Sequence, residues 1–155
     1  EYDRAIGPLS AALKIVPDDG YTMLSLGIAL EKTGLPQQAA TALQKAVSLE
    51  GMFFEARLQL MGLLGQHGQS EDALALAVET ATIARALPVE GAQWLFYVAN
   101  LNARLGRPQE AHQSIRESLA VLDGVGPTSH LGPGLAVREA IAALQEHLQK
   151  HPGGS

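Results

Sequence analysis

The sequence predicts an all-α fold of antiparallel helix hairpins, and three observations lead to this prediction. Glycine-led turn signals recur at Gly34, Gly68 and Gly106. The first two signals are 34 residues apart, a spacing typical of helical repeats. Small residues recur at the positions where neighbouring helices would have to approach closely.

Each turn signal ends one helix and begins the next. Its glycine can adopt the left-handed conformation that terminates a helix. Two positions later stand Pro36, Ser70 and Pro108. Proline suits the first position of a helix and serine suits the N-cap. Asp18-Asp19 and Glu71-Asp72 are likewise expected to cap helices rather than to form acid/base pairs.

The repeat extends to the N-terminus. Three small or apolar positions of the second helix recur 34 residues earlier, where Ala39, Leu43 and Ala46 correspond to Ala5, Leu9 and Ala12. The last interval, from Gly68 to Gly106, is 38 residues. We place the four extra residues between Arg85 and Gly91, where Pro88 and Gly91 interrupt the helical pattern.

These motifs resemble the tetratricopeptide repeat (TPR) family. The first full copy is the clearest, and its matching positions are Met23, Leu26, Gly27, Leu30, Ala39, Leu43 and Ala46. The resemblance covers about residues 3–123, and the second copy is the most degenerate, with Arg57 where the family has an aromatic residue. It implies a TPR-type α-solenoid, a right-handed superhelix of antiparallel helix hairpins.

The expected domain organisation is a TPR array over residues 1–123 followed by a C-terminal capping helix. The array divides into a leading half repeat (2–19) and three repeats (20–53, 54–91 and 92–123). Glycine and proline content predicts a loop over 124–134. A capping helix over 135–150 carries Leu135, Ile141, Leu144 and Leu148 on one face, and 151–155 form a disordered tail.

Composition argues against several classes of function. The net charge is −5 with no cluster of Lys or Arg, which does not fit a nucleic-acid surface. The chain has no cysteine, and no apolar run is long enough to span a bilayer. The opening residues do not resemble a signal peptide, which fits either a cytoplasmic protein or a sequence from which a targeting segment has been removed. The compartment is therefore left open, with the cytoplasm as the default expectation.

No catalytic motif is found, and we expect neither an enzyme nor a cofactor. There is no glycine-rich phosphate loop and no Gly-x-Ser-x-Gly nucleophile motif. His147 and His151 have the four-residue spacing of helical metal ligands but no third ligand in the sequence. We interpret them as a solvated pair near a helix C-terminus and expect no metal site.

The family resemblance implies a concave groove lined by the first helix of each repeat, which binds a peptide or a partner helix. By register, the groove residues are Tyr21, Leu24, Ile28, Leu58, Phe96, Tyr97, Asn100 and Arg104. Asn100 would fix a peptide backbone and Arg104 would pair with an acidic group. The expected function is therefore a non-catalytic protein–protein interaction scaffold.

Two alternatives remain open. The N-terminal helix has no first-helix partner in the sequence, so Ile6, Leu9 and Leu13 could drive self-assembly into a homo-oligomer. The chain could also be the recruiting arm of a larger multidomain protein.

Overall fold

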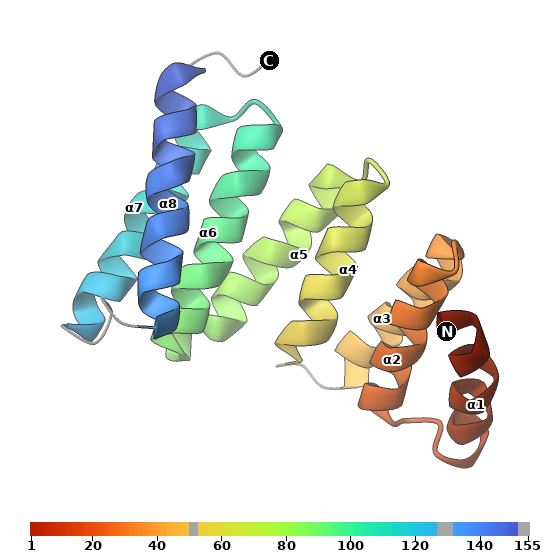
Figure 1. Cartoon of the computed structure of the whole chain (residues 1–155). Coiled ribbons are helices and arrows are strands. Elements are labelled where there is room, and N and C mark those ends of the chain that lie inside the picture. Colours follow the sequence, from red (N-terminus) through yellow and green to blue (C-terminus); the bar gives the residue numbers. More distant parts are fainter. Residues whose placement is uncertain (50–52, 127–131, 152–155) are drawn as a thin grey trace. The chain divides into compact units, whose positions relative to one another are not determined.

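A computed structural model describes residues 1–49, 53–126 and 132–151, and these residues form helices joined by short turns (Figure 1). No strand occurs in these ranges. The elements are α1 (Tyr2–Ile15), α2 (Gly20–Lys32), α3 (Pro36–Leu49), α4 (Phe54–Gln66), α5 (Ser70–Ile83), the 3₁₀ turn η1 (Ala84–Ala86), α6 (Pro88–Arg104), α7 (Pro108–Val125) and α8 (Gly132–Lys150).

The chain divides into two compact units, Glu1–Gln69 and Ser70–Ser155. The boundary lies between α4 and α5, which is inside the repeat expected over 54–91. This is also the copy with the weakest sequence pattern.

The three predicted glycine turns are present. Gly34, Gly68 and Gly106 have φ angles of 79°, 77° and 72°, a backbone region that side-chain-bearing residues rarely adopt. After each glycine, the next backbone N–H donates to a carbonyl oxygen five residues earlier, at 2.9 Å in all three turns. This is the hydrogen bond of a Schellman motif, and it ends α2, α4 and α6.

The first unit is held together by close packing of α2 against α3. A Cβ atom on Gly27 would lie 2.7 Å from Cγ and 2.8 Å from Cδ2 of Leu43. Leu43, Ala39 and Ala46 are completely buried. The small residues predicted to permit close helix approach therefore do so in this unit.

An aspartate side chain caps the start of α2. Asp19 Oδ1 accepts hydrogen bonds from the backbone N–H of Tyr21 (3.1 Å) and of Thr22 (3.4 Å). The Thr22 hydroxyl donates to Oδ2 at 2.6 Å. These bonds, first that of the Thr22 hydroxyl, lower the pKa of Asp19 below its ordinary value of 3.8. The adjacent Asp18 pairs with Lys45 of α3 at 3.2 Å.

This cap predicts a pH-dependent difference in stability between the wild type and Asp19→Asn. A carboxylate with a depressed pKa stabilises the folded state above its unfolded pKa, and this contribution is lost as pH falls through the folded pKa. Asparagine caps the helix without the charge. We expect wild type to melt at a higher temperature than Asp19→Asn at neutral pH, and the gap to close as pH falls below 3.8. Thermal melts over this range test it, and a gap that stays constant would contradict the assignment.

The four extra residues of the last interval form an additional turn of α6. This helix has 17 residues, whereas α2 and α4 have 13 each. Pro88 is the first residue of α6, as its fixed φ angle favours. The prediction that Gly91 interrupts the helix is wrong, because Gly91 lies within α6. A Cβ at this position would come within 3.0 Å of the Ala84 carbonyl oxygen, so the glycine permits close packing against η1.

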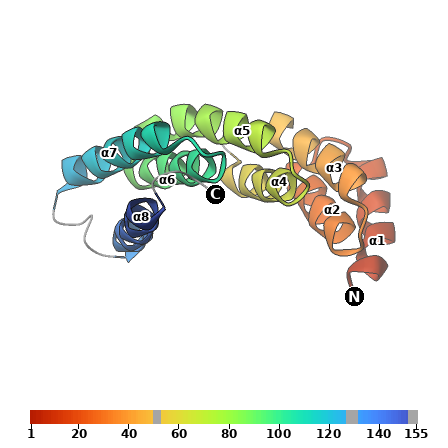
Figure 2. The same ribbon diagram turned by 90° about the horizontal axis from the view of Figure 1, so that it is seen from above.

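In the second unit α8 packs onto α6 and α7. Figure 2 shows α5 and α7 in one row, with α6 and α8 on the same side of that row. The apolar face of α8 joins α6 and α7 residues in one core cluster, which contains Ala92, Ala99, Ala111, Ile115, Leu122, Val137, Ile141, Leu144 and Leu148. The buried Ser118 hydroxyl also ties α7 to α6 by donating to the Ala92 carbonyl oxygen at 2.7 Å.

The segment around the predicted loop differs from expectation at both ends. Helix α7 continues to Val125 and α8 begins at Gly132, so part of the predicted loop over 124–134 is helical. Within α8, Val137 is buried, whereas Leu135 is 40% exposed. The prediction that Leu135 belongs to the buried apolar face of this helix is therefore wrong. Residues 127–131 and 152–155, which complete the predicted loop and tail, lie outside the described residues.

Candidate functional site

The four groove residues predicted in the first unit differ in accessibility. Tyr21, at the start of α2, is 63% exposed and its ring lies 4.7 Å from that of Phe53. Leu58 of α4 is exposed and Ile28 of α2 is half-buried. Leu24 is only 5% exposed, so it offers a ligand little surface and contributes mainly to the core of this unit.

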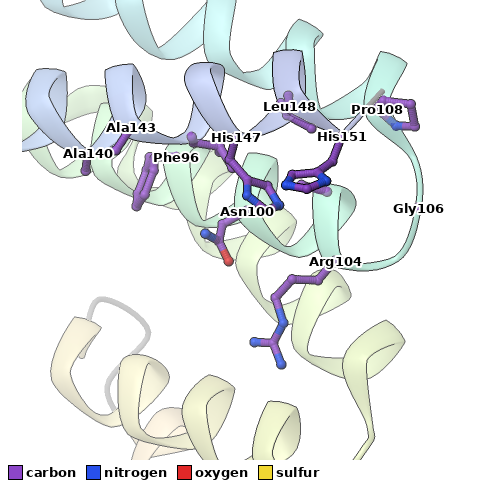
Figure 3. A pocket seen from close by; sticks show the side chains of 12 residues that line it. Phe96, Asn100, Arg104, Gly106, Pro108, Ala140, Ala143, His147, Leu148 and His151 are labelled. Atoms are coloured by element: carbon purple, nitrogen blue, oxygen red, sulfur yellow. The ribbon is translucent and has the colours of Figure 1, made fainter. Parts of the chain in front are cut away.

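The predicted residues of the second unit lie at a pocket between α6 and α8 (Figure 3). The pocket has a volume of about 760 Å³. Helix α6 contributes Phe96, Asn100, Ala103 and Arg104, the turn after it contributes Gly106, and α7 contributes its first residue, Pro108. Helix α8 with its following residue contributes Ala140, Ala143, Leu144, His147, Leu148 and His151. We refer to this cavity as the α6–α8 pocket.

The apolar part of the α6–α8 pocket is continuous with the core of the unit. Leu144 and Leu148 belong to the core cluster, and Phe96 and Ala103 pack against it while remaining partly accessible. A ligand side chain bound here would therefore contact a floor that is already fixed by packing, which lowers the entropic cost of binding.

The polar part of the pocket comes from two pairs of residues with the same spacing. Asn100 and Arg104 lie one helical turn apart on α6, and His147 and His151 lie one turn apart at the end of α8. Figure 3 shows the imidazoles on the α8 side and the Asn100 amide on the α6 side. The two imidazole rings are 4.8 Å apart, and in this view the Arg104 side chain extends away from α8.

Tyr97 does not line the α6–α8 pocket. Its hydroxyl accepts a hydrogen bond from Gln93 Nε2 at 2.8 Å, and its ring makes an edge contact with the buried Trp94 at 5.3 Å. The structure thus brings Phe96, Asn100 and Arg104 together at one site and places Tyr97 outside it.

The sequence interpretation did not include the histidines in the site. His147 and His151 are exposed, as expected of a solvated pair, and both also line the pocket. The available signal was their position beside Leu144 and Leu148, the buried stripe of α8. That signal shows that the histidines border a packed face but does not show which helix lies opposite.

A second cavity of about 580 Å³ lies among α5, α6 and α7, and the sequence did not indicate it. Its apolar residues include Val78, Leu95 and Val98, and its polar rim carries both Arg85 and the acidic Glu110 and Glu117. Charges of both signs around this cavity do not favour one class of ligand.

The described residues contain no group of three or more His, Asp or Glu side chains that could hold a metal ion. In the same residues, no helix is both long enough and apolar enough to cross a membrane. The lining of the α6–α8 pocket offers apolar contact, hydrogen bonding by Asn100 and pairing of Arg104 with an anion.

The helices recur along the chain, and glycines with positive φ join the two helices of a pair. Together with packing through buried alanines, this pattern defines an all-α helical-repeat protein of the α-solenoid class. A family model described as tetratricopeptide repeat matches residues 1–51 and 63–123, well over half of the chain. The chain belongs to the tetratricopeptide repeat family. The unmatched residues between the two segments include most of α4, in the copy with the weakest sequence pattern.

Solved structures with the same fold include MamA proteins. A crystal structure of MamA is 18% identical, covers 97% of this chain and 92% of that chain, and has a TM-score of 0.63. MamA 41-end from Desulfovibrio magneticus RS-1 is also 18% identical, with coverage of 96% and 82% and a TM-score of 0.62. MamA MSR-1 C2 is 25% identical, with coverage of 97% and 86% and a TM-score of 0.54. No curated protein sequence matches the chain.

Family membership assigns the general role of the protein. Tetratricopeptide repeats are protein-interaction repeats, so the chain is a protein-interaction scaffold.

Proposed function

We propose that the chain is a non-catalytic scaffold that binds an extended or helical protein segment, and that the α6–α8 pocket is its binding site in the second unit. The observation that supports this proposal most strongly is the convergence of Phe96, Asn100 and Arg104 on a pocket of about 760 Å³. An apolar floor with a few polar groups is the usual composition of a ligand pocket.

The apolar and the polar residues of the pocket contribute different parts of recognition. Phe96, Ala140 and Ala143 provide accessible apolar surface for ligand side chains, and the buried Leu144 and Leu148 support it from below. The Asn100 amide can both donate and accept, which suits a peptide backbone. Arg104 is exposed at the pocket, where its guanidinium can pair with a carboxylate of the partner. In the first unit, the exposed Tyr21 and Leu58, with the half-buried Ile28, are the proposed contacts.

The α6–α8 pocket predicts that reversing the charge of Arg104 weakens peptide binding. With a peptide selected on the immobilised protein from a random display library, Arg104→Glu should raise Kd at least about tenfold. Fluorescence anisotropy measures the change. The matched control is Arg116→Glu, since Arg116 is an exposed arginine of α7 that does not line the pocket. Equal losses in both variants, or failure to select any peptide, would contradict the proposal.

One observation favours self-assembly as a second candidate function. No residue of α1 is buried, and the residues at its C-terminal end include Ile15, which is 82% exposed, and the exposed Val16. Apolar side chains of this size at an exposed helix end could pack against a second copy of the chain.

Self-assembly predicts a mass that depends on protein concentration and on these residues. Light scattering over a concentration series should show dimers or larger species for the wild type and a smaller mass for Ile15→Lys/Val16→Lys. The control Lys14→Ala changes a neighbouring exposed residue without adding a charge to the apolar patch. A mass that stays monomeric at all concentrations would exclude this candidate.

A further inference from the structure

The α6–α8 pocket has a charge character opposite to that of the whole chain. The chain carries a net charge of −5, yet none of the pocket's lining residues is acidic. Its ionisable members are Arg104, His147 and His151. A site with only basic ionisable groups on an acidic protein favours anionic ligands and disfavours basic ones.

The two histidines make the charge of the pocket variable. Both are exposed, so protons reach them freely, and their rings lie 4.8 Å apart on the last turn of α8. Histidine is the side chain that ordinarily gains its charge between about pH 8 and pH 5. Protonation of either imidazole would therefore add positive charge next to the Asn100 amide and the apolar floor.

The groups around the imidazoles are few. Helix α6 presents Arg104, which is cationic throughout this pH range. The turn after α6 and the start of α7 contribute only the uncharged Gly106 and Pro108. On α8 itself, Glu146 pairs with Lys150 at 2.6 Å, so their charges largely offset each other. The described lining thus holds no carboxylate that would neutralise protonated imidazoles.

We propose that the α6–α8 pocket recognises an acidic, leucine-rich protein segment, and that its affinity rises as His147 and His151 become protonated. The inference rests on the proposed function. The accessible apolar lining favours a segment with aliphatic side chains over a free anion, because a small anion would leave Phe96, Ala140 and Ala143 in contact with water. By linkage, binding of the acidic segment should also take up protons.

The test uses a short soluble peptide that alternates leucine with glutamate, labelled with fluorescein, and the whole chain in buffer with EDTA. Glutamate stays mostly ionised at about pH 6, so a change in affinity between about pH 8 and pH 6 reports on the protein. We expect Kd to fall about tenfold over this range for the wild type. In His147→Gln/His151→Gln the change should be less than about twofold.

Two controls test whether the pH-dependent affinity comes from the two histidines and from the glutamates of the peptide. His67→Gln replaces an exposed histidine that follows α4 in the first unit and does not line the pocket, and it should keep the pH dependence. A twin peptide with glutamine in place of glutamate should bind more weakly at about pH 6 and show no pH dependence. EDTA removes metal bridging by the two histidines as a cause.

The possible outcomes separately test the pH dependence, the preference for acidic segments and the pocket as the binding site. Binding that requires Arg104 but is independent of pH, or that is pH-dependent without the two histidines, would overturn the inference and leave the proposed function intact. Equal affinity for both peptides would overturn the acidic preference. No binding of either peptide, or binding unaffected by Arg104→Glu and by the double histidine variant, would overturn the inference and count against this pocket as the binding site.

Discussion

Replacing Leu43 with alanine should lower the free energy of unfolding of the first unit by about 3 kcal/mol. Leu43 is among the largest fully buried side chains of the chain, and its Cγ and Cδ2 atoms occupy the space above Gly27. The substitution leaves a cavity between α2 and α3 that the surrounding helix backbones cannot fill. Native-state hydrogen exchange of the amides in α2 and α3 measures this loss within the unit.

A double-mutant cycle with Gly27 tests whether close packing of Leu43 over Gly27 stabilises the first unit. Gly27→Ala alone should destabilise the unit by about 1–2 kcal/mol, because the new Cβ would clash with the fully buried Leu43 side chain. In the Leu43→Ala background the clashing atoms are absent, and alanine should then be neutral or stabilise α2 by up to about 1 kcal/mol. The two substitutions should therefore couple by about 2 kcal/mol. Additive effects would show that α2 and α3 do not pack at this distance.

Ile141→Ala should destabilise the second unit by about 3 kcal/mol and should also weaken peptide binding. Ile141 is buried at the centre of the α8 stripe that joins the core cluster. Because α8 carries Leu144, His147 and Leu148 to the pocket, looser packing of the helix disturbs one wall of the site. Denaturant unfolding followed by the fluorescence of the buried Trp94 reports the stability of this unit.

Leu135→Ala is the matched control for this prediction. Leu135 lies on the same helix but is exposed, so its truncation should cost less than about 1 kcal/mol and leave binding unchanged. Similar losses in the two variants would mean that α8 does not pack through the face that contains Ile141.

The hairpin turns and the packing positions could be predicted because both depend on local physics. A glycine with positive φ, followed two residues later by proline or serine, specifies a helix end and a helix start with no information from elsewhere in the chain. Repetition at a fixed period then showed which alanines face a neighbouring helix. Gly91 was misjudged because glycine serves both as a helix breaker and as a point of close packing, and the local pattern does not separate these roles.

The sequence predicted only those residues of the candidate site that are spaced by one helical turn on α6. Phe96, Asn100 and Arg104 are four residues apart on α6 and so share one face, whereas Tyr97 is rotated away from it and bonds to Gln93. The contribution of His147 and His151 depends on where α8 packs. Its apolar stripe predicts that one face is buried but not which helix covers it, so tertiary structure was needed to place the histidines.

Nuclear magnetic resonance titration of the isotope-labelled chain with the leucine–glutamate peptide tests the central claim most directly. We expect the largest shift changes at the Asn100 side-chain amide and at the His147 and His151 imidazoles, with smaller changes around Val78 and Glu117 of the second cavity. Changes concentrated at the second cavity or on α1, with Asn100 and the two histidines unaffected, would contradict the assignment of the α6–α8 pocket as the binding site.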